Sequence, residues 1–123
     1  MKRFYLLVLP ALLLIAGLVG CGSSSLSRNE YTIATGSKSG VYYPIGEALA
    51  QILKKTFPDV TLKIMETAGS VENLELLRDG KVDMALVQND IAYYAAQGEA
   101  MFNGKKITNV SGIATLFPEV VQI

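Results

Sequence analysis

Three short segments of this chain combine small, hydroxyl-bearing and amide side chains, the types that bind small polar molecules. The first, "TGSKSGVYY", runs from Thr35 to Tyr43 and holds two glycines, two serines and an adjacent pair of tyrosines. Glycines let a backbone approach a ligand closely, serines add hydroxyl donors, and a tyrosine ring can wall a pocket while its phenol forms a hydrogen bond. The segment predicts a pocket rim, although glycine after a strand also serves ordinary turns.

The other two segments are "ETAGS" (66–70) and "QND" (88–90). Each of the three segments leads into a predicted helix, whose first N–H groups and positive partial charge suit a carboxylate or phosphate. The spacing of Gly36 and Gly40 lacks the Gly-Lys-Ser/Thr ending of a nucleotide P-loop and does not fit the dinucleotide fingerprint. The first segment therefore fits neither of these two nucleotide-binding motifs.

Composition argues against catalysis and against nucleic acid. The chain has no histidine and one cysteine, Cys21, which excludes a Ser-His-Asp or Cys-His arrangement and a His/Cys metal site within these 123 residues. No spacing requires Glu66, Asp83 and Asp90 to form an acid/base pair. No basic block is present, so nothing favours nucleic acid. We predict a binding protein that is not an enzyme, with no cofactor and no metal.

Strand and helix patterns alternate along the chain. Strands are predicted at 31–35, 60–64, 83–87 and 110–117, and residues 119–123 begin another. A helix with Pro44 in its first turn ends before Pro58, and its apolar stripe is Ile45, Leu49, Ile52 and Leu53. Two more helices are predicted at 70–80 and 91–97. This order predicts an α/β fold with a parallel sheet, in which all three polar segments lie beyond the carboxyl ends of the strands.

Details of the elements can also be predicted. Ser70 should cap the second helix, and Asn89 or Asp90 the third. The segment 83–87 is a compact apolar run, typical of a central parallel strand. Tyr93 and Tyr94 are interpreted as packing residues rather than ligand contacts.

The N-terminus has the pattern of an export signal. Lys2 and Arg3 precede an apolar run interrupted by Pro10, and small residues follow. "LVGC", ending at Cys21, resembles the lipobox of bacterial lipoproteins, which implies cleavage before Cys21 and acylation of that residue. Two or more acyl chains anchor a protein stably. We therefore expect a signal peptide at 1–20, a lipid-anchored flexible tether at 21–30 and an extracytoplasmic location, with membrane lipid as a partner.

Three motifs together resemble the N-terminal part of TAXI-family solute receptors, the binding proteins of TRAP-type secondary transporters. They are "TGSKSGVYYPIGEALAQIL", "ETAGSVENLELLRDGKVDMALVQNDIAYYA" and "FPEVVQI". The resemblance implies a type II periplasmic-binding-protein fold, a small organic anion such as a glutamate-like amino acid or dicarboxylate as solute, and a TRAP-type permease as partner. The ligand contacts it implies are Ser39, Gly40, Tyr42, Thr67, Gly69, Ser70, Gln88 and Asp90.

The resemblance also implies that residues 31–123 form an incomplete first lobe of a two-lobe domain. Chain beyond Ile123 would supply the second lobe, one wall of the cleft and a strand of the first sheet. We therefore expect poor solubility and no useful solute affinity for these residues alone. Two alternatives remain open at this point: a lipid-anchored α/β enzyme whose catalytic residues lie in further sequence, and a sensor domain that reuses the same fold.

Overall fold

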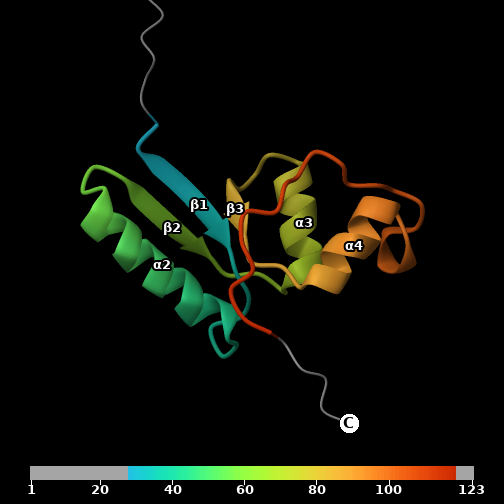
Figure 1. The fold of residues 1–123 in the computed structure, drawn as a ribbon, viewed down its shortest axis with the longest axis horizontal. Helices are drawn as coiled ribbons and strands as arrows, with labels where there is room; N and C mark the ends of the chain where they lie inside the picture. The colour runs from blue at the N-terminus through green and yellow to red at the C-terminus, as the bar shows by residue number, and fades with distance from the viewer. Residues whose placement is uncertain (1–27, 119–123) are drawn as a thin grey trace, which may run out of the picture.

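A computed structural model of the chain describes residues 28–118, in which strands and helices alternate as the sequence predicts (Figure 1). The three strands form one parallel sheet in the order β2-β1-β3. The predicted signal peptide, Cys21 and the strand predicted at 119–123 lie outside the described residues. The elements are β1 Glu30–Ala34, α2 Tyr42–Thr56, β2 Thr61–Met65, α3 Ser70–Arg78, β3 Met84–Ala85, α4 Asn89–Gln97 and a 3-10 turn, η1, Ala100–Phe102.

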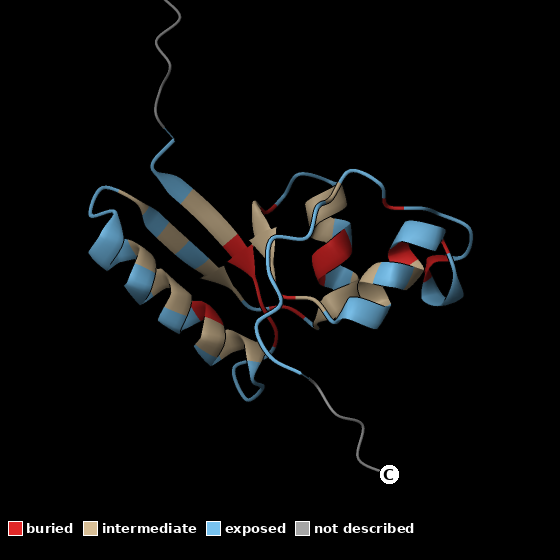
Figure 2. Cartoon of the chain, viewed as in Figure 1, coloured by how far each residue is buried: buried red, intermediate tan, exposed pale blue. Residues whose placement is uncertain are grey.

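The central strand β1 organises the sheet. It pairs with β2 along all five residues but with β3 at only two positions, Ile33 with Met84 and Ala34 with Ala85. Ile33 and Ala34 are almost fully buried, and Figure 2 shows this burial concentrated at the carboxyl end of β1. The predicted central strand at 83–87 is therefore shorter than expected and lies at one edge of the described sheet, since its far side has no paired strand among residues 28–118.

Helix α2 packs against β2, and α3 and α4 lie on the other side of the sheet (Figure 1). Gly46 is the buried residue of α2, and Leu49 and Leu53 are half-buried on the same face. Ile52 was expected in this apolar stripe, but it is 61% exposed. At 100° per residue the buried face centres near Gly46, Leu49 and Leu53, which leaves Ile52 at its margin.

The main hydrophobic cluster lies between α3, α4 and η1. It consists of Leu74, Ala95, Phe102 and Ile107, with Tyr94 among the half-buried residues around it. Tyr93 is 58% exposed, with its ring against Tyr94. The packing role predicted for both tyrosines is thus clear for Tyr94 alone.

The strand predicted at 110–117 is wrong. This segment has no regular secondary structure, and no backbone hydrogen bond joins it to the rest of the described chain. Ile113 is 85% exposed and Leu116 51%. A strand needs a hydrogen-bonded neighbour, and a groove of about 970 Å³ separates this segment from β3.

Candidate functional site

The three predicted binding segments meet at one edge of the sheet. Because the strands are parallel, the loops that follow β1, β2 and β3 all leave from their carboxyl ends, the edge at which open α/β sheets bind ligands. Two hydrogen bonds link neighbouring loops directly. The Lys38 N–H donates to Oε1 of Glu66 at 3.0 Å, and the Gln88 N–H donates to the Ser70 hydroxyl oxygen at 3.0 Å. The prediction that these three segments lie together beyond the carboxyl ends of the strands is confirmed.

The first loop is a tight, exposed turn. The Gly40 N–H donates to the carbonyl of Ser37 at 2.9 Å, and the Ser37 and Ser39 hydroxyl oxygens lie 3.1 Å apart. A Cβ atom at Gly40 would lie 3.3 Å from the Ser37 carbonyl oxygen, closer than most such contacts. Ser39 and Gly40, both predicted ligand contacts, are exposed at this turn. They are therefore accessible to a solute at the edge of the sheet.

Tyr42 joins the first loop to the groove beside β3. It is half-buried at the start of α2, and its ring meets the Phe117 ring edge-on at 6.5 Å. Tyr42 also lines the groove between β3 and residues 109–118. The adjacent Tyr43 turns elsewhere, with the Lys38 ammonium 5.8 Å from its ring centroid. Of the two tyrosines, Tyr42 is thus the one placed to wall a cavity.

The second loop is shaped by Thr67 and Gly69. Thr67 is buried, and its hydroxyl accepts a hydrogen bond from the Gly69 N–H at 3.2 Å. Gly69 has φ 113°, a conformation that favours glycine, and it occupies the N-cap position of α3. Ser70 was predicted to be this N-cap, but it is the first helical residue. Its hydroxyl accepts from Gln88 instead of capping the helix, because Gly69 already makes the turn.

The third loop ends at Gln88, which is the N-cap of α4. The predicted caps, Asn89 and Asp90, are instead the first two residues of that helix. Gln88 and Asp90 are both exposed, as a ligand contact requires. One carboxylate oxygen of Asp90 accepts a hydrogen bond from the Ile91 N–H at 2.8 Å, which leaves its other oxygen for a further donor.

Charged side chains around the three loops bind the loop backbone itself. Glu66 accepts from the Lys38 N–H, and its Oε2 lies 3.9 Å from the Lys38 ammonium. Glu72 accepts from the Ala68 N–H at 2.6 Å. These carboxylates hold two N–H groups that an anionic solute could otherwise use. Lys38 supplies a positive charge beside the first and second loops.

Asn73 is the residue of this region that the sequence analysis missed. It lies on α3 with no exposed surface, and its side-chain amide contacts the chain after all three strands. The available signal was a polar side chain of low helix propensity between the apolar positions Val71, Leu74 and Leu77.

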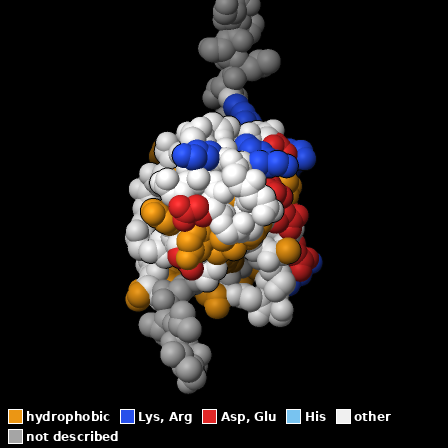
Figure 3. Space-filling model, turned by 90° about the vertical axis from the view of Figure 1, so that its right-hand side faces the viewer, with side chains coloured by type: hydrophobic (Ala, Val, Ile, Leu, Met, Phe, Trp, Pro, Cys, Tyr) orange, Lys and Arg blue, Asp and Glu red, His pale blue; other side chains and the backbone are white. Residues whose placement is uncertain are grey.

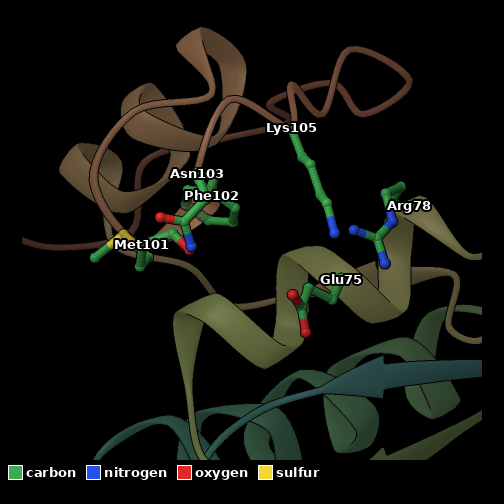
Figure 4. A pocket seen from close by; sticks show the side chains of 6 residues that line it. All are labelled: Glu75, Arg78, Met101, Phe102, Asn103 and Lys105. Carbon is green, nitrogen blue, oxygen red and sulfur yellow. The ribbon is translucent and has the colours of Figure 1, made fainter.

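A smaller hollow of about 140 Å³ lies at the opposite end of α3, and Figure 4 shows its lining. The Lys105 side chain reaches toward Arg78 above Glu75. Arg78 is bound to Asp79, and this hydrogen bond lowers the pKa of the Asp79 carboxyl below its ordinary value. The hollow is small and lies away from the strand ends, so it does not compete with the loops as a candidate site.

Residues 28–118 lack both a metal-binding cluster and a membrane-spanning helix. Residues 28–118 contain no group of three or more His, Cys, Asp or Glu placed to hold a metal ion. Within the same residues, no helix is long and apolar enough to cross a membrane. In the view of Figure 3, Lys and Arg side chains gather at the top, toward the amino ends of the strands and away from the three loops.

The model of the NMT1-like family matches residues 33–123. The match includes the carboxyl end of β1, all three loops and every later element. Members of this family are periplasmic solute-binding proteins with a periplasmic-binding-protein fold, and they are typically binding proteins rather than enzymes. The prediction of an α/β periplasmic-binding-protein fold is confirmed, and an extracytoplasmic solute-binding role agrees with the family. The chain belongs to the NMT1-like family of periplasmic solute-binding proteins.

Proposed function

We propose that this chain is an extracytoplasmic receptor of the TAXI type, which captures a small organic anion and delivers it to a TRAP-type permease. The solute class is a glutamate-like amino acid or a dicarboxylate. One observation carries the proposal: three loops rich in small and hydrogen-bonding residues are linked to one another at the carboxyl edge of a parallel sheet, in a chain of a solute-binding family.

Different residues at this edge recognise different chemical groups of the solute. Loop N–H groups and the first turns of α3 and α4 attract the solute carboxylate, while Lys38 adds a positive charge. Asp90 accepts from an ammonium or hydroxyl group, and the Tyr42 ring walls the site. Thr67 is buried and acts mainly on the shape of its loop. The proposed ligand residues are Ser39, Gly40, Tyr42, Thr67, Gly69, Ser70, Gln88 and Asp90.

Membrane attachment is the second part of the proposal. Acylation of Cys21 after removal of residues 1–20 would hold the receptor at the membrane near its permease, with residues 21–30 as the tether. In the structure the chain is already fixed at Arg28, whose guanidinium binds the Asp83 carboxylate through both oxygens. The folded part therefore begins slightly before β1, at the amino edge of the sheet and opposite the candidate site, so residues 28–30 of the expected tether belong to the folded part.

Paired solutes test the proposal at Asp90. L-glutamate carries an ammonium group and succinate does not. Asp90→Asn should therefore lower the affinity for glutamate and leave the affinity for succinate unchanged. Loss of one charged hydrogen bond weakens binding about tenfold. Asp59→Asn is the control, since it removes the same charge from an exposed residue at the amino edge. Affinities come from calorimetric titration of the complete mature receptor, with both expected lobes, and heat of dilution is subtracted.

The outcomes separate the parts of the proposal. Selective loss of glutamate in Asp90→Asn, with Asp59→Asn unchanged, supports the role of Asp90. Equal affinities in all three proteins would remove Asp90 from the site. Absence of saturable binding for both solutes, and for related amino acids and dicarboxylates, would overturn the proposed solute class.

A further inference from the structure

Asn73 is a fully buried polar side chain that neither the fold pattern nor the predicted ligand set uses. It lies on α3, one residue before the core residue Leu74, and has no exposed surface. Asparagine is a poor helix former because its side chain competes for backbone groups. Burial of an amide is unfavourable unless its hydrogen bonds are made. Its position therefore requires a specific set of partners.

Those partners come from all three loops of the candidate site. The Asn73 Nδ2 group donates to the Thr35 carbonyl at 2.6 Å and to the Leu86 carbonyl at 2.8 Å. Its Oδ1 accepts from the Thr67 hydroxyl at 2.6 Å. Thr35 follows β1, Thr67 follows β2 and Leu86 follows β3. A single side chain thus connects the carboxyl ends of the three strands, and we name these four residues the Asn73 network.

The chemistry of the network fits an amide and little else. An amide offers two N–H donors and one carbonyl acceptor, and here both donors and the acceptor have partners. Aspartate would face two carbonyl oxygens with at most one proton. Leucine would remove the donor to the Leu86 carbonyl and would leave the Thr67 hydroxyl and the Thr35 carbonyl with only their mutual 3.1 Å contact. Among the described residues, no buried side-chain polar atom lacks a hydrogen bond.

The network extends to the exposed rim of the site. The Thr67 hydroxyl accepts from the Gly69 N–H at 3.2 Å, and the next residue, Ser70, accepts from the Gln88 N–H at 3.0 Å. Displacement of the second loop is therefore transmitted to both neighbours. The loops keep fixed relative positions before a solute arrives, which reduces the cost of ordering them on binding.

We propose that Asn73 is the positioning residue of the solute site: it contacts no solute and fixes the three loops that do. This inference rests on the proposed function for its ligand consequence, but the loop coupling itself is measured without any solute. Asn73→Asp keeps the shape of the side chain and removes one donor. Thr67→Val removes the hydroxyl, and Thr67→Ser is the conservative control that retains it.

Amide hydrogen exchange followed by NMR, with no solute added, tests the coupling. Asn73→Asp should speed exchange at Gly69, Leu86 and Gln88 about tenfold, because a lost buried hydrogen bond opens the loops locally. The interior of α2 should exchange at its original rate. Thr67→Val should also speed amide exchange at Leu86 and Gln88, whereas Thr67→Ser should leave these exchange rates unchanged.

Leu74→Ala provides the comparison for a purely structural role. Leu74 is equally buried on the same helix but makes no side-chain hydrogen bond, so its truncation should raise exchange across α3, α4 and η1 without selecting the loops. If Asn73→Asp gives the Leu74→Ala pattern, or if Thr67→Val leaves Leu86 and Gln88 unchanged, the positioning role is wrong. If Asn73→Asp does not fold, the two Thr67 variants decide the question alone.

A glutamate and succinate titration then separates this inference from the proposed function. Asn73→Asp should weaken the binding of whichever solute the original protein binds. The loss of affinity should be larger than in Leu74→Ala when both variants are measured at temperatures at which the same fraction of each is folded. Equal weakening by both variants would reduce Asn73 to a structural residue. Absence of solute binding by the complete mature receptor would contradict the proposed function, while the exchange result would still decide the coupling.

Discussion

Gly46 is a point of close approach between α2 and the sheet, and its substitution tests the packing that positions the first loop. It is the buried residue of α2. A Cβ atom built at Gly46 would lie 2.6 Å from Cγ2 of Thr35 and 3.4 Å from Cγ2 of Ile64. Thr35 is itself fully buried, with its hydroxyl donating to the Met65 carbonyl at 2.8 Å. Gly46→Ala therefore inserts a methyl group where the helix meets β1 and β2.

Two effects of opposite sign determine how much Gly46→Ala changes the free energy of unfolding. Alanine is favoured over glycine inside a helix by about 1 kcal/mol. Carbon atoms at optimal contact lie about 3.5–4.0 Å apart, so the helix must move by roughly 1 Å. Such overpacking costs about 1–3 kcal/mol. The middle of that range exceeds the gain in helix propensity by about 1 kcal/mol. We therefore expect Gly46→Ala to lower the free energy of unfolding by about 1 kcal/mol.

Thr35→Ser provides a matched background because it removes Cγ2 and keeps the hydroxyl. In that background Gly46→Ala should raise the free energy of unfolding by about 1 kcal/mol, because the clash with Cγ2 is gone and the higher helix propensity of alanine remains. The assay is urea unfolding followed by circular dichroism at the helix band. The two single variants and the double variant form a cycle, which should give a coupling of about 1–3 kcal/mol. Stabilisation by Gly46→Ala in the original chain would refute the close approach.

Two further predictions concern charge and lipid. Arg78 lowers the pKa of Asp79, mainly through its hydrogen bond, so this carboxylate stabilises the fold above its ordinary pKa of 3.8 and ceases to do so as the pH falls through the lowered value. Asp79→Asn should therefore lower the melting temperature at neutral pH and have no effect at strongly acidic pH; an equal loss at both would contradict the assignment. When the chain is expressed with its leader in bacteria, mass spectrometry should find a mature N-terminus at Cys21 with acyl chains, and Cys21→Ser should remain unprocessed. An unmodified Cys21, or cleavage elsewhere, would contradict lipid attachment.

The elements that the sequence predicts well depend on local signals. β1, α2, β2 and α3 agree with the prediction within a few residues, because alternation, an amphipathic stripe and Pro44 near a helix start act within short segments. The parallel order follows from the alternation of strands and helices. The convergence of three polar segments at one sheet edge then follows from the order alone.

The failures depend on partners that are distant in the chain. Residues 110–117 have strand composition, but β structure exists only where a neighbour pairs with it, and none does within residues 28–118. For the same reason β3 extends over two residues instead of five. Ile52 has the right spacing for a buried face, yet the close contact at Gly46 decides which side of α2 meets the sheet.

The candidate site shows the same division. The exposed positions of Ser39, Gly40 and Gln88 at the carboxyl edge of the sheet could be predicted from residue type and from position after a strand. Asn73 could not, because its role comes from three carbonyl and hydroxyl groups that only the fold brings together. The N-cap role of Gly69 likewise depends on a φ of 113° that residue type alone does not reveal.

An NMR titration of the isotope-labelled complete mature receptor with L-glutamate and with succinate asks directly whether the three loops bind the solute. We predict saturable shifts of the amide signals at Gly40, Gly69 and Gln88 with at least one of these solutes, while the amide signals at the amino edge around Asp59 stay unchanged. Saturable shifts confined to residues away from the three loops, or no saturable shift at Gly40, Gly69 and Gln88 with either solute, would contradict the assignment of these loops as the solute site.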